Sequence, residues 1–232
     1  MMETIIGRKR EQMLIAEYCQ SRRAEFIAVY GRRRVGKTYL VKNFFHNQFA
    51  FYMTGIFEGT LADQLANFSV RLSIHSQRQQ KIPGSWFEAF SMLQSYLESL
   101  KGSENLVVFI DELPWLDTPN SRFIKALELF WNSWGSTCTR LKFFVCGSAT
   151  TWMLSKIIGD RGGLHNRVTH RIYLRSFTLS ETEDYLKANG FVYNRQQIID
   201  VYMILGGIPF YLSMLRASLG VEQNVDQLFF AE

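Results

Sequence analysis

Gly31-Arg32-Arg33-Arg34-Val35-Gly36-Lys37-Thr38 is the stretch that decides the fold, and it follows the pattern G-x-x-x-x-G-K-[ST]. The apolar run before it, residues 25–30, predicts a short buried strand, and the apolar spacing over residues 38–45 predicts a helix after it. Glycines allow the backbone N–H groups of such a loop to turn inward around a phosphate, and the helix adds the positive end of its dipole. The stretch therefore predicts a phosphate-binding loop between a strand and a helix.

The two residues that end this loop carry the expected chemistry. Lys37 is predicted to place its ammonium between the β- and γ-phosphates of a nucleotide, and the Thr38 hydroxyl to ligate Mg²⁺. The competing interpretation is a chance match in a glycine-rich turn, which the flanking strand and helix disfavour.

A second motif follows the continuous apolar run of residues 106–110, which is typical of a strand buried on both faces of a parallel sheet. Ligands gather at the carboxyl ends of such strands, so Asp111 and Glu112 are expected beside the phosphate loop. Asp111 is predicted to hold Mg²⁺ through a water, and Glu112 to face the water that attacks the γ-phosphate. A strand that merely ends in a polar turn is the alternative.

Three further polar residues are candidates for contacts with the phosphates. Ser148 follows the apolar run of residues 141–146 and is either a sensor of the γ-phosphate or the N-cap of a helix over residues 150–157. Arg167 and Arg161 are candidates for neutralising the charge that develops during phosphoryl transfer, within the chain or towards a neighbouring subunit. A solvated loop arginine is the alternative for each.

Two groups near the loop leave alternatives open. The apolar-apolar-Gly-Arg turn of residues 5–8, which ends in Gly7 and Arg8, either lies against the base of a nucleotide or closes the edge of the domain. Arg32, Arg33 and Arg34 project away from a phosphate held by the backbone, so they are either solvated or contact a partner or nucleic acid.

Composition limits the class of protein. The 232 residues carry a net charge of +5, which is compatible with nucleic-acid contact without requiring it. Three unevenly spaced cysteines argue for reduced thiols, and the four histidines show no metal-ligand spacing. No leader opens the chain, and the apolar segment 201–215 is interrupted by Gly206, Gly207 and Pro209. We therefore expect a cytoplasmic protein without a membrane span.

The order of the predicted elements indicates an α/β fold of three layers. Residues 1–175 are expected to form a core with a parallel five-stranded sheet in the order 5-1-4-3-2. From residue 176 the pattern contains helices only, so residues 176–232 are predicted to form a small helical lid.

With these motifs assembled, the chain resembles the AAA+-like ATPases of the STAND class, and within them the archaeal and bacterial family with a G-R-R-R-x-G-K-T loop and a D-E strand end. The resemblance rests on Gly7-Arg8, residues 31–38, residues 109–116, Gly147-Ser148, Arg167 and residues 206–209. It implies that a Gly-x-Pro element in the lid, here Gly207 and Pro209, sits over adenine. The usual Pro-Leu-Tyr-Gly-Arg segment is replaced here by residues 163–167, which keep only the arginine.

The expected function is Mg²⁺-dependent ATP binding and hydrolysis that acts as a conformational switch. One alternative is a scaffold that binds ADP or ATP without hydrolysis and contacts a protein or DNA partner; another is a phosphotransferase. Relatives continue into winged-helix and nuclease-like regions, which are not found before residue 232, so a protein or DNA partner is expected through that missing C-terminal region. The oligomeric state stays open.

Overall fold

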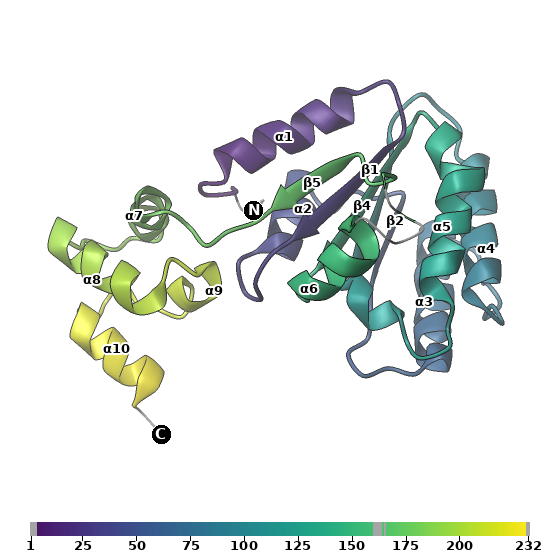
Figure 1. Ribbon diagram of the computed structural model, residues 1–232. Helices are drawn as coiled ribbons and strands as arrows, with labels where there is room; N and C mark the ends of the chain where they lie inside the picture. The colour runs from purple at the N-terminus through teal and green to yellow at the C-terminus, as the bar shows by residue number, and fades with distance from the viewer. Residues whose placement is uncertain (1–3, 160–163, 165, 231–232) are drawn as a thin grey trace.

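The computed structural model describes residues 4–159, 164 and 166–230. Its centre is a parallel sheet in the order β2-β3-β4-β1-β5 (Figure 1). The strands are β1 Glu25–Tyr30, β2 Phe51–Thr54, β3 Leu106–Asp111, β4 Leu141–Gly147 and β5 His170–Tyr173. This arrangement confirms the predicted order 5-1-4-3-2 and the α/β class.

Helices cover both faces of the sheet, and β1 shows why. Side chains alternate along a strand, so Phe26 and Ala28 face one layer while Ile27 and Val29 face the other. The first layer contains α3 Leu61–Ser76, α4 Trp86–Ser99 and α5 Phe123–Ser133, and the second contains α1 Lys9–Gln20 and α2 Lys37–Phe44. The unbroken apolar runs of the sequence thus become strands buried from both sides.

Two short 3₁₀ turns lie at opposite edges of the sheet. Leu113–Leu116 follows β3 at the carboxyl edge, and Gly135–Thr137 lies between α5 and the amino end of β4. After β4 the chain forms α6 Thr150–Trp152, which continues as a π-helical segment, Met153–Ile158. The helix predicted over residues 150–157 is therefore present but widened, a feature that often occurs at functional sites.

The helices beyond β5 have a small core of their own. They are α7 Leu179–Ala188, α8 Arg195–Leu205, α9 Pro209–Leu212 and α10 Val221–Phe229. α7 begins with a capping box in which Thr178 and Glu181 each bond the other's backbone N–H. Phe177, Leu186 and Phe191 are among the apolar residues that pack together here. We call residues 176–230 the lid.

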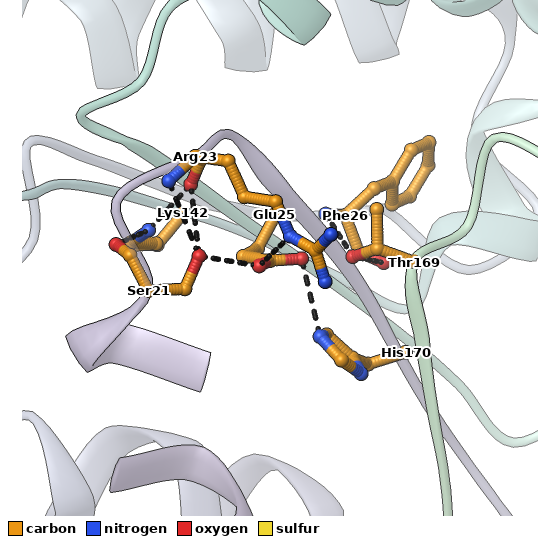
Figure 2. A network of polar contacts seen from close by, with 7 residues as sticks. All are labelled: Ser21, Arg23, Glu25, Phe26, Lys142, Thr169 and His170. Atoms are coloured by element: carbon orange, nitrogen blue, oxygen red, sulfur yellow. Dashed lines mark hydrogen bonds and ion pairs between the residues drawn. The ribbon is translucent and has the colours of Figure 1, made fainter. Parts of the chain in front are cut away.

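A buried polar network lies at the amino ends of the strands, opposite the phosphate loop (Figure 2). Lys142 of β4 is fully buried and donates from Nζ to the carbonyls of Ser21 (2.8 Å) and Arg23 (2.6 Å), just beyond α1. The buried carboxylate of Glu25 accepts from Ser21 Oγ (2.5 Å) and Arg23 Nε (3.0 Å), and lies 3.1 Å from His170 Nε2. Burial opposes ionisation, but the hydrogen bonds from Ser21 and its neighbours prevail and lower the pKa of Glu25. The network therefore fixes the end of α1 to three strands.

Candidate active site

The phosphate loop closes tightly against the strand next to it. Gly31 has φ +150°, and a Cβ there would lie 2.2 Å from the carbonyl oxygen of Leu174, so no larger residue fits. Gly36 has φ +89° and forms the N-cap of α2. The loop therefore leads directly to a helix N-terminus, where backbone N–H groups and the helix dipole favour a phosphate.

Lys37 is buried and folds back over its own loop. Its Nζ donates to the carbonyl oxygens of Gly31 (3.0 Å) and Arg32 (2.8 Å). Two of the three ammonium donors are thereby satisfied, which compensates the burial of the charge. The amine keeps the loop curved and remains beside the space that the loop encloses.

The two sequence motifs meet at Thr38 and Asp111. The Thr38 hydroxyl donates to Asp111 Oδ2 at 2.8 Å, and the other carboxylate oxygen accepts from the backbone N–H of Glu112 at 3.0 Å. A hydroxyl and a carboxylate are hard oxygen ligands of the kind that Mg²⁺ takes together with water and substrate phosphates. Among the described residues no group of three or more His, Cys, Asp or Glu has metal-binding geometry. The oxygen atoms of Thr38 and Asp111 are of the chemical type that fits Mg²⁺.

Ser148, the residue after β4, holds the Glu112 side chain in one orientation. Glu112 has φ +46°, which is uncommon for a residue with a side chain, and its Oε2 accepts from Ser148 N (3.2 Å) and Ser148 Oγ (3.0 Å). The residue that precedes α6 is Ala149, and no side chain caps that helix. Ser148 therefore contacts Glu112 and does not cap α6, and its role as a sensor of the γ-phosphate stays a prediction.

A cavity of about 1260 Å³ lies between the phosphate loop and the lid. Predicted site residues that line it are Arg8, Arg33, Arg34, Val35, Gly36, Lys37, Thr38, Glu112 and Pro209. Ile5 and Ile6 also line this cavity, together with Tyr185 and Asn189 of the lid. An apolar wall with few polar groups is the usual setting for a nucleotide base.

Other predicted residues lie outside this lining. Asp111 and Ser148 are connected to it through their bonds with Thr38 and Glu112, and Arg32 through its carbonyl bond to Lys37. Gly31 belongs to the loop itself, whereas Gly7 and Gly207 pack behind the cavity wall. Arg167 is exposed and does not line the cavity, and Arg161 lies outside the described residues.

Gly207 packs closely against the backbone of Phe177 at the start of the lid. It has φ +63°, its carbonyl accepts from the N–H of Phe177 at 2.8 Å, and a Cβ would lie 2.4 Å from the Phe177 carbonyl oxygen. Pro209, two residues later, opens α9 and faces the cavity. The two residues of the Gly-x-Pro element therefore have different positions. Gly207 packs against Phe177, whereas Pro209 lines the cavity.

Arg8 joins three parts of the molecule. Its Nη2 donates to the carbonyl of Val35 in the loop at 3.0 Å, its backbone N donates to Glu181 Oε1 at 2.8 Å, and its guanidinium lies 4.6 Å from the ring centre of Phe177. Burial lowers the pKa of Arg8, and the Glu181 carboxylate opposes this effect. The turn before α1 thus connects the phosphate loop to the first helix of the lid.

Arg34 has a contact that neither alternative for the loop arginines anticipated. Its Nη1 donates to the hydroxyl of Tyr211 at 2.7 Å, and its guanidinium lies 4.6 Å from the ring centre of Phe210. The Arg34 carbonyl also accepts from the Phe210 N–H at 3.4 Å. The exposed side chain is therefore bonded to α9 of the lid, and its contact with a partner or nucleic acid stays a prediction.

Two aromatic residues that line the cavity have no role predicted from the sequence. Phe57 and Trp115 follow the ends of β2 and β3, and their ring centres are 5.4 Å apart in an edge-on arrangement. The Arg33 guanidinium lies 6.0 Å from the centre of the Phe57 ring. The sequence signal for a site role was their position shortly after the ends of two strands. The neighbouring residues, however, do not distinguish such aromatic residues from aromatic residues of the core.

A family model described as an ATPase domain predominantly from Archaea matches residues 6–215. An uncharacterised protein of Methanocaldococcus jannaschii is 24% identical over 215 residues, which cover 91% of this chain and 44% of that protein. The chain therefore spans less than half the length of this curated relative.

Three solved structures share the fold. A Walker-type ATPase of Pyrococcus abyssi has a TM-score of 0.63 and 18% identity, covering 90% of this chain and 66% of its own. A STAND protein with a tetratricopeptide repeat sensor from Pyrococcus horikoshii has a TM-score of 0.60 and 16% identity, covering 99% and 33%. The Aeropyrum pernix ORC2 protein, in ADPNP–ADP complexes, has a TM-score of 0.64 and 17% identity, covering 97% and 69%.

Proposed function

The chain belongs to the family of ATPase domains found predominantly in Archaea, and we propose that it binds ATP with Mg²⁺ and hydrolyses it as a switch to which the lid responds. The observation that carries this proposal is the 2.8 Å hydrogen bond between Thr38 and Asp111. It joins the phosphate loop to the acidic end of β3, as a shared metal and triphosphate require.

Each polar group then has a defined task. Lys37 and the N–H groups before α2 neutralise charge on the β- and γ-phosphates. Thr38 and Asp111 would hold Mg²⁺, which supplies positive charge to the phosphate oxygens. Glu112 accepts a proton from the attacking water, whose oxygen bonds to the γ-phosphorus as the bond to the β–γ bridging oxygen breaks. Ser148 orients Glu112 through the two hydrogen bonds to Oε2.

Adenine is the base that we favour. Ile5, Ile6 and Pro209 provide apolar surface for a base within the same cavity as Lys37. The ORC2 protein, which shares the fold, was crystallised with adenine nucleotides, and this likeness supports the same choice. The contribution of Gly207 would be indirect, because it determines where Pro209 lies.

The lid is in a position to respond to the nucleotide because it contacts the loop directly. Arg34 bonds to Tyr211, and Arg8 bonds to both Val35 and Glu181. A ligand that shifts the loop backbone must therefore alter contacts with α7 or α9. The output of this switch is proposed to be a contact with a protein or DNA partner.

Two substitutions test the proposal against a scaffold that does not hydrolyse ATP. Lys37→Ala should abolish binding of a fluorescent ATP analogue, whereas Glu112→Gln should bind it normally and release no phosphate. Isothermal titration and a phosphate-release assay measure the two properties. If wild-type phosphate release equalled that of Lys37→Ala, the protein would be a nucleotide-binding scaffold. If Glu112→Gln kept full turnover, the base would have to be another residue.

A further inference from the structure

The edge strand β5 and the residues that follow it carry a row of exposed cationic and aromatic side chains. Arg171, Tyr173 and Arg175 are exposed, while Ile172 and Leu174 between them are buried beneath α1 and α2. Alternate residues of an extended chain share a face, so the three exposed side chains point to the same side. Among the residues that the structure describes, β5 pairs with β1 alone and is the last strand of the sheet.

The charge of this row is not compensated locally. Residues 161–180 contain four arginines and two histidines but no aspartate or glutamate. Within the described part of the chain, no carboxylate pairs with Arg171, Arg175 or the side chain of Arg32. Free guanidinium groups of this kind attract anions, and phosphate groups match their geometry best.

A cavity of about 560 Å³ continues the row towards the phosphate loop. Its lining includes Arg32, Tyr173, Arg175, Ser176, Thr178 and Tyr202. Two arginines and several hydroxyl groups thus surround a space next to the nucleotide cavity, with which it shares Val35 and Phe177 as lining residues. The combination can bind a phosphate and hydrogen-bond a sugar.

The aromatic member of the row is partly exposed and held by its neighbours. Tyr173 is 45% exposed, its ring packs 5.2 Å from that of Tyr30, and the Arg175 guanidinium lies 5.8 Å from its centre. A supported, half-exposed ring flanked by arginines is the arrangement on which single-stranded bases stack while their phosphates are neutralised.

We propose that the row of Arg171, Tyr173 and Arg175, with Arg32 at its end, binds single-stranded nucleic acid. The arginines contact consecutive phosphates and Tyr173 stacks on an unpaired base. A duplex hides its base faces in the helical stack, so it offers only the phosphates and binds more weakly. The contacts are not specific for sequence, because phosphates and base faces are common to all strands.

Fluorescence anisotropy with labelled oligo(dT) and oligo(U) of equal length tests this proposal on the wild-type chain. Saturating ADP and Mg²⁺ are present, so that the phosphate loop cannot hold the strand. We expect micromolar binding of the kind typical of non-sequence-specific contacts. Tighter binding of oligo(U) than of oligo(dT) would indicate that the hydroxyl groups in the cavity contact the sugar. Equal binding of the two strands would restrict the contacts to phosphate and base. Both outcomes support the site.

Arg171→Glu/Arg175→Glu should weaken binding at least tenfold and lower the salt dependence by about 0.7 per arginine. The matched control, Arg78→Glu/Lys101→Glu, makes the same charge change at exposed positions after α3 and α4 and should keep the affinity within about twofold. Tyr173→Ala should lose about tenfold, and Tyr173→Phe should retain binding. Circular dichroism spectra and melting temperatures verify that each variant is folded.

Several results would overturn the proposal. Absence of binding at low salt in the presence of ADP, an equal loss in the control variant, or equal affinity for a duplex would each exclude this surface as a single-strand site.

Discussion

The guanidinium of Arg34 and the hydroxyl of Tyr211 are 2.7 Å apart although 177 positions separate them in the sequence. This bond fixes the phosphate loop to α9 of the lid. Arg34 has φ +69°, a conformation that costs a residue with a side chain about 1–3 kcal/mol. The loop thus accepts a strained backbone at the residue whose side chain binds the lid.

Substitutions at Arg34 separate the strain from the contact. Arg34→Ala loses the bond to Tyr211 and keeps the strain, whereas Arg34→Gly loses both. We expect the glycine variant to be more stable than the alanine variant by about 1 kcal/mol in urea unfolding. Hydrogen exchange of α9 should accelerate in both variants and, less strongly, in Tyr211→Phe. An α9 that stayed equally protected in all three would show that the lid does not depend on Arg34.

Ser148→Ala should lower turnover about tenfold with little change in KM, because it removes a hydrogen bond to the Glu112 carboxylate and none to the nucleotide. Ser148→Thr keeps the hydroxyl and should restore most of the rate. Steady-state phosphate release across ATP concentrations measures both constants. A rise in KM at unchanged kcat would instead place Ser148 in ground-state binding.

Gly206 and Gly207 form a matched pair for the lid. Both have φ +63°, but a Cβ at Gly206 meets no atom within 4 Å, whereas one at Gly207 would lie 2.4 Å from the Phe177 carbonyl oxygen. Gly206→Ala should cost about 1 kcal/mol, from backbone conformation alone. Gly207→Ala should cost at least about 2 kcal/mol more and expose the lid to limited proteolysis. Equal melting temperatures for the two variants would contradict this account of Gly207.

His75 should make the protein less stable in mild acid. Burial lowers its pKa below the ordinary 6.5, and its Nε2 accepts from the N–H of Tyr52 at 3.1 Å, so the folded state holds it neutral. The unfolded chain then binds the proton first, and stability falls as pH drops below about 6.5. Burial also lowers the pKa of His170, which acts in the same direction despite the opposing charge of Glu25.

His75→Gln retains a hydrogen-bond acceptor without a titrating group. Between about pH 7.5 and about pH 5.5 the variant should lose less unfolding free energy than the wild type, by up to about 1.4 kcal/mol. Glu25, with its lowered pKa, titrates below this range and does not contribute to it. Parallel pH profiles of the two proteins would show that His75 can be protonated in the folded state.

Part of this fold and of its site can be predicted from the amino-acid sequence. The loop at residues 31–38 and the buried strand that ends at Asp111 were predictable from local signals, namely backbone freedom at glycine and apolar periodicity. The order of the sheet followed from general rules for layers and connections in α/β folds, and the place of Asp111 from the rule that ligands gather at the carboxyl ends of parallel strands. The meeting of Thr38 and Asp111 followed from the same rule.

Only the tertiary structure decided which distant side chains meet. The bond of Arg34 to Tyr211 and that of Arg8 to Glu181 depend on where the lid packs, which no local pattern encodes. Lys142 reads as an interruption of an apolar strand until Ser21 and Arg23 are seen to offer their carbonyls to it. A polar or charged side chain has many conceivable partners along the chain, and packing of the apolar surfaces selects among them because only that packing fixes which groups lie within hydrogen-bonding distance.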